Sequence, residues 1–514
     1  MATERETLSV VDHAWLRMDR PTNLMMICGL MTFAGKLDLV RLKAVVRERM
    51  LCFHRFRQRV GWEGGEAYWE TDPAFDLDWH VRQLALPRGA GQRGLDKLAG
   101  DLVSTALDPS KPMWQMHLID VDASHSALML RIHHCYGDGF ALAHVMGALT
   151  DSSANHHALP SPDLDGTPPP RAAWEKMLGQ VTELAGDGVR LARTAYALAA
   201  DWSGHPDHAL AAARRGVNLA TELAVVAAME PDCPTRFKGP LGVMKRVASA
   251  RSLSLDEVKA VASALSCSVN DVLLSCVTAA LRRYLLDQDD AVDGVEMRAL
   301  VPVNLRPPGP VQELGNHFGL VFLGLPLGEA DALRRTRAIH ERMEALKHSQ
   351  QATVALGILA CMGAAPDGLR ETLVQALAAN ASAVITNVRG APEARYLGGQ
   401  RITRQVFWVP QSGGIGLGIS ILSYAGQINL GVVADVQRVP DPEALANHIG
   451  TEFEALLLRC LTMPWPARLA ADVGKAAVTT APKRKRSTNR TTGASRTAGT
   501  TGITKPPPAH QGTD

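Results

Sequence analysis

The chain has 514 residues, of which 46% are hydrophobic and 21% are charged, and its formal net charge is +2. This composition is typical of a folded soluble enzyme, and it excludes an intrinsically disordered or collagen-like chain. Because a chain of this length exceeds one ordinary hydrophobic core, we expect two domains.

The N-terminus and the cysteines predict an intracellular setting. Residues 1–19 carry charges from the start and contain no apolar segment of a secretory signal. The eight cysteines occur singly, with no CxxC pair and no histidine cluster at zinc spacing, which favours a reducing compartment. The longest apolar run, 352–365, is too short to span a bilayer and is more typical of a core helix than of an interfacial one. We therefore expect a cytoplasmic protein.

The stretch 133–139 reads His-His-Cys-Tyr-Gly-Asp-Gly and is the most informative motif of the chain. It follows the apolar run 127–132, which is typical of a buried strand, and it precedes 140–149, whose apolar residues have helical spacing. The motif is therefore predicted at a strand-to-helix turn, a common position for catalytic groups. A neutral imidazole there can take a proton from a hydroxyl near pH 7, while Asp138 can order the loop and Gly139 permits a tight turn.

Two other interpretations of the motif residues remain open. A single histidine on an apolar strand is more often a satisfied core residue than a catalyst, although the combined pattern of two histidines and Asp-Gly favours function. Cys135 lies inside the motif, but as a nucleophile it would need an activating partner of its own.

After the motif, the chain divides into a helical crossover and a second α/β half. A Pro-rich break at 160–170 is followed by Ala-, Leu- and Arg-rich segments up to 229, which predict helices. In the second half, we predict strands at 246–253, 298–305, 318–325, 382–387 and 415–423, and helices at 254–266 and 268–286. The predicted domains are an N-terminal domain 1–170, a crossover 171–238, a C-terminal domain 239–470 and a tail 471–514.

The glycine-rich stretch 414–418 does not predict a nucleotide site. It lacks the GxGxxG spacing and leads into an apolar strand instead of a helix, and no Walker element occurs in the chain. We therefore expect no metal or organic cofactor.

Residues 475–514 differ in kind from the rest of the chain. They hold eight Lys or Arg against the single Asp514, with many Thr, Ala, Gly and Pro residues, so we expect a disordered tail of net charge +7. Since the whole chain is +2, the preceding 474 residues carry −5. The basic run 483–486 could bind anionic lipid head groups, or nucleic acid without specificity, although a merely solvated tail is more common.

Several elements besides the motif resemble the bacterial wax ester synthase/diacylglycerol acyltransferase family, whose signature is HHxxxDG. In chain order they are 8–12 (LSVVD), 75–81 (FDLDWHV), 112–114 (PMW, where the family has PLW), 268–271 (SVND), 315–316 (GN) and 387–390 (NVRG, where the family has NVPG). The resemblance covers about residues 6–465.

The resemblance implies an α/β fold and an active site. The fold is a pair of sandwich domains like those of chloramphenicol acetyltransferase and condensation domains, joined by the helical crossover, with the active site in a tunnel between them. His134 would be the general base that activates the acceptor hydroxyl for attack on acyl-CoA. His133, Asp138 and Gly139 would support the motif, Asp138 through an ion pair with an arginine that the sequence does not identify. Asn270 would lie near the oxyanion.

The implied substrates are acyl-CoA and either diacylglycerol or a long-chain alcohol, with peripheral contact to the inner membrane face or to lipid inclusions and with no specific nucleic acid. Two alternatives stay open: a condensation-type acyltransferase with another acceptor, such as an amine, and a non-catalytic coat protein of lipid droplets or membranes. The PMW, ND and NVRG elements favour ester formation. The intact His134, Asp138 and Gly139 argue against a coat protein, which needs no positioned base.

Overall fold

The computed structural model describes residues 5–154, 229–306, 314–349, 351–364, 371, 374–375, 377–411 and 413–463. The chain divides into a body, Met1–Thr462, and a second unit, Met463–Asp514. The helices predicted between 171 and 228 and the basic tail predicted over 471–514 lie outside the described residues. Those two predictions therefore stay predictions.

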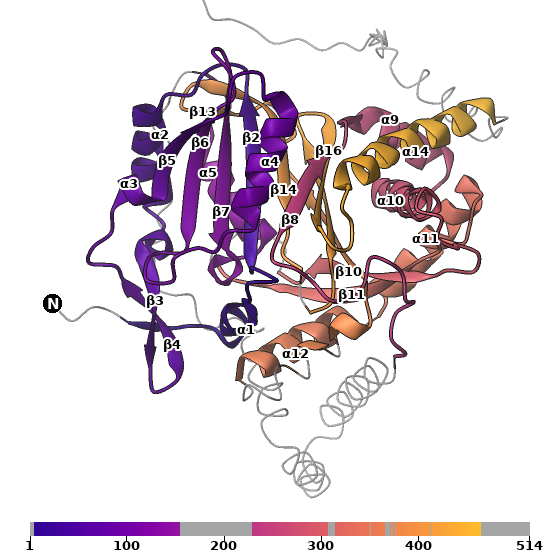
Figure 1. Ribbon diagram of the computed structural model, residues 1–514, viewed down its shortest axis with the longest axis horizontal. Coiled ribbons are helices and arrows are strands. Elements are labelled where there is room, and N and C mark those ends of the chain that lie inside the picture. The colour runs from indigo at the N-terminus through magenta and orange to yellow at the C-terminus, as the bar shows by residue number, and fades with distance from the viewer. Residues whose placement is uncertain are drawn as a thin grey trace, which may run out of the picture. The chain divides into compact units, whose positions relative to one another are not determined.

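The first half of the chain supplies most of a six-stranded sheet with the order β13-β14-β2-β7-β6-β5. Its own strands are β2 (Met26–Phe33), β5 (Val81–Ala85), β6 (Trp114–Asp120) and β7 (Ser126–His133). All eight residues of β7 are buried, and five of them are apolar. Helix α4 (Gly91–Val103) packs on one face of the sheet and α5 (Gly139–Leu149) on the other (Figure 1).

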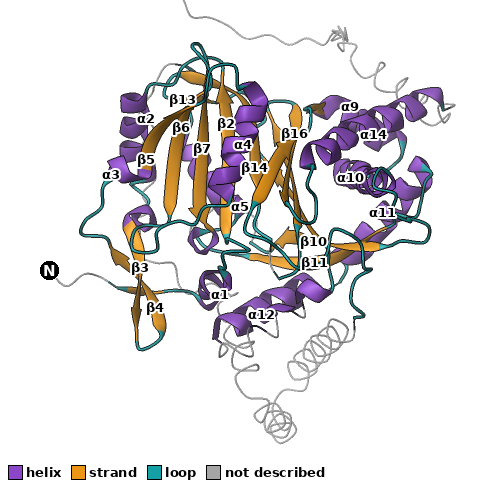
Figure 2. Ribbon diagram, in the orientation of Figure 1, coloured by secondary structure: helices purple, strands orange, loops and turns teal. Residues whose placement is uncertain are grey.

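The second half builds a mixed sheet with the order β11-β10-β12-β15-β16-β8. Its strands are β8 (Lys245–Ser249), β10 (Met297–Asn304), β11 (Phe318–Leu325), β12 (Ala383–Arg389), β15 (Leu417–Tyr424) and β16 (Gln427–Asp435), with the short β9 (Leu253–Ser254) beside β16. Four helices, α9 (Leu255–Ala264), α10 (Val269–Leu286), α11 (Ala332–Lys347) and α14 (Pro442–Thr462), share one core with this sheet (Figure 2).

The two halves exchange one piece of sheet. Strands β13 (Tyr396–Leu397) and β14 (Gln400–Trp408) come from the second half but join the first sheet, where β14 pairs antiparallel with β2. After β14, the chain returns to the second sheet, where β15 begins at Leu417. The second half thereby completes the sheet of the first, a connection that the linear division of the chain at residue 239 does not reveal.

The predicted elements of the second half are largely confirmed. The strand predicted at 318–325 is β11, and the helix predicted at 268–286 is α10, which Ser268 caps. The single strand predicted at 246–253 is wrong in detail, because it forms β8 and β9. Between them, the Ala250 N–H donates to the Leu430 carbonyl and Ser252 bonds the Asn429 side chain, so the chain bends before it pairs again.

The apolar run at 352–365 forms most of α12 (Gln351–Ala364), and the core interpretation of it is confirmed. Val354, Leu359 and Met362 are buried, and the helix packs against β11 and against α1 (Val10–Met18). A Cβ at Gly319 of β11 would collide with the Ala352 carbonyl, so only glycine allows this close approach.

Within the described residues, no single helix is long and apolar enough to cross a membrane. Helices α9 and α10 meet the length and composition criteria only as a pair, and the pair is bent by 97°.

Candidate active site

The strand-to-helix turn predicted for the motif is present. Strand β7 ends at His133, a short 3-10 turn covers His134–Tyr136, and α5 begins at Gly139. The N–H of His134 donates to the Met25 carbonyl at 2.7 Å, which ties the turn to the start of β2. Backbone bonds thus fix the position from which the His134 side chain projects.

His134 lies under an aromatic cover. Its imidazole stacks on the indole of Trp15 with a centroid distance of 4.1 Å and an interplanar angle of 13°, and the Phe318 ring lies 5.7 Å away. The side chain is only 6% exposed, and this burial lowers the pKa of His134 to about 4, against a smaller opposing effect of Asp138. The imidazole is therefore neutral at pH 7 and can accept a proton. No described residue bonds its buried Nδ1.

His133 and Cys135 are poorly suited to be the reactive group of the site. His133 is buried, its Nδ1 accepts the Cys135 N–H at 3.2 Å, and burial lowers its pKa to about 3. The Cys135 thiol is buried as well, and burial raises its pKa well above the usual value for cysteine. A thiol that resists ionisation is a poor nucleophile, so the geometry argues against Cys135 as the reactive group.

Main-chain hydrogen bonds and an ion pair hold the Asp138 carboxylate in place. Its Oδ1 accepts the N–H groups of Phe140 and Ala141 at 3.0 Å, which makes it the N-cap of α5. Both of its carboxylate oxygens lie 2.6 Å from the Nη1 of Arg306, which follows β10 in the second half. The main-chain N–H of His317 also donates to Oδ2 at 2.9 Å. The arginine that the sequence could not identify is thus Arg306, and the ion pair joins the two halves at the motif.

A second connection between the halves comes from the Gly-Asn element at 315–316. The Asn316 amide donates to the Asp12 carboxylate and to the His134 carbonyl, both at 2.7 Å. Burial raises the pKa of Asp12 to about 6, partly offset by the bond from Asn316. Gly315 has a φ of +124°, a conformation that side chains disfavour, and its carbonyl accepts a bond from Arg306 at 2.7 Å.

His134 faces an apolar groove, which we call the His134 groove. Asp138 and Gly139 line it beside His134, and so do apolar residues from both halves: Trp15, Ile27, Leu300, Phe318, Val384, Val388 and Phe407. The groove and the solvent at its mouth enclose about 770 Å³. A neutral base beside apolar walls suits a substrate that carries a hydroxyl or a thioester on a hydrocarbon chain.

Asn270 does not line this groove. Its side-chain oxygen accepts a bond from Asn387 at 3.0 Å. Along β12, Thr386 and Val388 face the groove, whereas Asn387 points to the opposite side, because side chains alternate along a strand. The geometry therefore gives no support to the prediction of Asn270 near the oxyanion.

Sequence reasoning missed four residues of the site. Trp15 stacks on His134, and Arg306 pairs with Asp138. The other two, Asp12 and Asn316, are hydrogen-bonded to each other. Asp12 and Asn316 belong to elements noted in the sequence, LSVVD and GN, but nothing there indicated what they contact. Within the described ranges, no cluster of three or more His, Cys, Asp or Glu could hold a metal ion.

The comparison with family models decides the relationship. The model of the wax ester synthase/diacylglycerol acyltransferase catalytic domain matches residues 8–273, and the model of the C-terminal domain of the same family matches residues 314–457. The chain belongs to this family. Membership confirms the family, the acyltransferase activity and the enzyme class predicted from the sequence, and it does not favour the coat-protein alternative.

Individual relatives agree with this membership. A Mycobacterium tuberculosis protein named as a probable diacylglycerol O-acyltransferase is 27% identical over 403 residues, which are 77% of this chain and 83% of that protein. The wax ester synthase/diacylglycerol acyltransferase of Marinobacter aquaeolei superposes with a TM-score of 0.62 at 21% identity, covering 88% of this chain and 99% of the other. The first condensation domain of the calcium-dependent antibiotic synthetase superposes with a TM-score of 0.57 at 15% identity. The superposition covers 91% of this chain and 98% of that domain. These two structures confirm the predicted fold class.

Proposed function

We propose that His134 is the general base in the transfer of a fatty acyl group from acyl-CoA to a lipid hydroxyl. The observation that carries this proposal is a neutral, buried imidazole that lines an apolar groove and is held from both halves of the body. The proposed acceptors are diacylglycerol, which gives triacylglycerol, and a long-chain alcohol, which gives a wax ester.

The proposed reaction balances without any further reagent. His134 takes the proton from the acceptor hydroxyl as its oxygen attacks the thioester carbonyl, and negative charge then collects on the carbonyl oxygen. When this intermediate collapses, the bond from carbon to sulfur breaks and the CoA thiolate takes the proton from the imidazolium. The low pKa of His134 makes the imidazolium a better acid in this second proton transfer, and it makes the neutral imidazole a weaker base in the first. No cofactor is needed in this scheme, and acyl-CoA acts as a substrate.

The main-chain N–H of Gly139, at the start of α5, is our candidate for binding the oxyanion. Gly139 lines the His134 groove, whereas the N–H groups of the next two residues, Phe140 and Ala141, are already bound to Asp138. This placement replaces the earlier expectation for Asn270.

A set of acceptor assays tests the proposed function. Purified protein is incubated with labelled palmitoyl-CoA and, in separate reactions, with hexadecanol, dipalmitoylglycerol or hexadecylamine, and each product is identified by mass spectrometry. We expect ester from at least one of the two hydroxyl acceptors. Amide as the main product would favour a condensation-type reaction, and no acyl transfer in any reaction would contradict the proposal.

We also propose peripheral contact with an anionic lipid surface through the basic tail. Residues 475–514 carry a net charge of +7, and each basic residue near an anionic membrane contributes about 1 kcal/mol. A chain truncated after Gly474 should bind anionic vesicles more weakly than the full chain, and the difference should shrink as salt screens the charges. The rate on short, soluble substrates should not change. Equal vesicle binding by both chains at low salt would overturn this proposal.

A further inference from the structure

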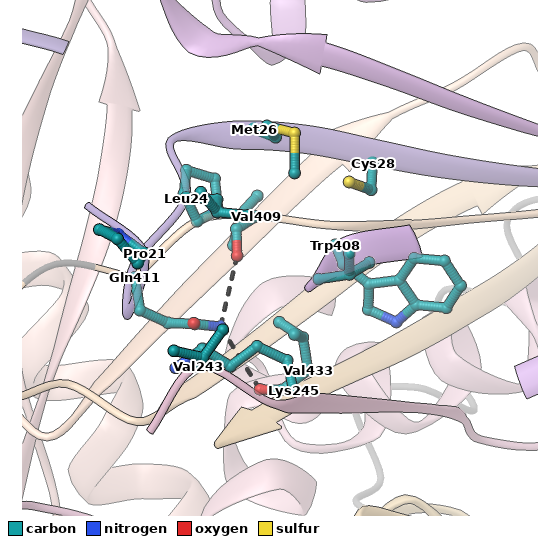
Figure 3. Close-up of a pocket in the computed structure, with 12 residues that line it drawn as sticks. Pro21, Leu24, Met26, Cys28, Val243, Lys245, Trp408, Val409, Gln411 and Val433 are labelled. Atoms are coloured by element: carbon teal, nitrogen blue, oxygen red, sulfur yellow. Dashed lines mark hydrogen bonds between the residues drawn. The ribbon is translucent and has the colours of Figure 1, made fainter. Parts of the chain in front are cut away.

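A second apolar pocket lies next to the His134 groove, and we call it the Trp408 pocket (Figure 3). Its apolar lining includes Leu24, Met26, Cys28, Trp408 and Val433. Lys245 also lines it, with its ammonium bound to the Asp435 carboxylate at 2.6 Å. Together with the solvent at its mouth, the pocket encloses about 360 Å³. Such walls suit a hydrocarbon chain better than a polar ligand.

The two pockets lie along one row of the second sheet. Val384 of β12 pairs with Gly418 of β15, and Gly418 pairs in turn with Val433 of β16. Val384 lines the His134 groove and Val433 lines the Trp408 pocket, so the two pockets are only two strand spacings apart, about 10 Å. Between them lies a strand that presents no side chain at this position.

The side chain of Gln411 occupies the space above Gly418. A Cβ at residue 418 would lie 2.8 Å from the Gln411 amide nitrogen, so the glycine is what makes room for this side chain. Gln411 belongs to the return segment between the sheets, and Val409, Pro410 and Gln411 line both pockets. Gln411 therefore stands at the boundary between them.

The hydrogen bonds of Gln411 are long. Its amide nitrogen donates to the Val409 carbonyl at 3.4 Å and to the Val433 carbonyl at 3.5 Å, and Figure 3 shows the side chain reaching between them. Bonds of this length hold a side chain weakly. Val409 and Pro410 also belong to the boundary, and the weakly bound Gln411 amide is its polar part, beside Val433 over Gly418.

We propose that Gln411 sets the length of hydrocarbon chain that the enzyme accepts, by closing the His134 groove against the Trp408 pocket. The proposal rests on the function proposed above, since it assumes a substrate whose reacting end lies at His134. Shortening the side chain at 411 joins the two cavities and lets the far end of a longer chain enter the Trp408 pocket. Each additional methylene group that becomes buried should raise the relative affinity for the longer chain about fourfold.

The test measures competition between chain lengths within one reaction. In the first arm, wild type and Gln411→Ala receive an equimolar mixture of palmitoyl-, arachidoyl- and lignoceroyl-CoA with a single short alcohol, and the ester products are compared. In the second arm, the donor is fixed as palmitoyl-CoA and the alcohols vary in length. A ratio within one sample does not depend on how much of the protein is folded.

We expect Gln411→Ala to raise the ratio of long-chain to palmitoyl product at least about fivefold in one arm. The arm that responds identifies whether the chain belongs to the acyl donor or to the acceptor. Adding Val433→Phe to Gln411→Ala should refill the pocket and return the ratio toward that of wild type. Gln405→Ala is the matched control, since Gln405 lies on β14 but lines neither pocket.

Unchanged ratios in both arms would overturn the inference while leaving the proposed function intact, because wild type would still form ester. Absence of ester from wild type with dipalmitoylglycerol as well as with the alcohols would instead contradict the proposed function. If Gln411→Ala does not fold, Gln411→Ser shortens the same side chain and is expected to shift the ratio in the same direction.

Discussion

Two aspartates at the start of helices, Asp138 and Asp271, have nearly the same local chemistry. Both are 2% exposed, and both help to cap the helix that follows, α5 and α10 respectively. Each also binds a basic side chain from a distant element, Arg306 for Asp138 and His340 for Asp271 at 2.8 Å. In the sequence, both aspartates belong to elements that resemble the family, 133–139 and 268–271.

The two aspartates differ in where their helices begin. The start of α5 lines the His134 groove, and the Arg306 pair connects the two halves of the body there. The start of α10 lies on the other side of the second sheet, and the partner of Asp271 belongs to α11 in the same helical layer. A cap and an ion pair therefore do not indicate function by themselves. Their position relative to the groove does.

The largest effect is expected from removing the proposed base, His134, which lies beside the start of α5. His134→Ala should lower kcat/KM by about 10² to 10⁴, because no neutral imidazole remains to take the hydroxyl proton. The measurement is ester formation from palmitoyl-CoA, with circular dichroism to verify the fold. More than about a tenth of wild-type activity in a folded variant would show that another group is the base.

Asp138→Asn should lose both stability and activity. The change leaves the Arg306 guanidinium without its carboxylate in a buried site, which costs about 3 to 5 kcal/mol in the free energy of unfolding. Urea unfolding gives the stability and the acceptor assay gives the activity. A variant of wild-type stability with no activity would instead assign Asp138 a direct part in proton transfer.

The low pKa of His134 predicts an unusual pH profile. Burial lowers this pKa to about 4, and the base must be neutral, so kcat/KM should hold as the pH falls through 6.5, where an exposed histidine becomes half protonated. Half of the activity lost near pH 6.5, in protein that remains folded, would contradict the prediction.

Stability must be measured at the same pH values. The folded pKa values of His133 and His134, about 3 and about 4, lie below the unfolded value, so the stability they contribute above about pH 6.5 is lost as the pH falls toward 4. The raised pKa of Asp12, about 6, acts in the opposite direction between pH 6 and 3.8. Thermal unfolding at each pH separates loss of the fold from loss of the base.

Asp271→Asn is the matched counterpart of Asp138→Asn. It weakens the capping box with Ser268 and the bond to His340, so we expect a loss of about 1 kcal/mol in the free energy of unfolding. The activity of the folded protein should stay within about twofold of wild type, since a cap away from the groove touches no substrate. A loss of activity as large as that of Asp138→Asn would break the distinction between the two regions.

The smallest effect is expected for Asn270→Ala. The side chain lies on the side of β12 away from the groove, so activity should change by less than about threefold, whereas removing an oxyanion donor costs about 10² or more. A decrease of that larger size would restore the role first predicted for Asn270.

The sequence by itself determined the local elements and the central residues of the motif. The apolar run at 127–132 predicted β7, the spacing of 140–149 predicted α5, and His134 and Asp138 were placed at the turn between them. These features depend on neighbours along the chain, on the period of a strand or helix and on a cap, and such signals are present in a short window.

Only the tertiary structure decided which distant residues complete the site. Arg306 is 168 positions from Asp138, and Asn316 is 182 positions from His134. Gln411 reaches the boundary of the groove only because β14 leaves its own half to join the first sheet. The position of Asn270 away from the groove is of the same kind, because it depends on which face of β12 meets the groove. A single sequence carries the chemistry of each side chain but not the pairing of strands, and it is the pairing that brings these residues together or keeps them apart.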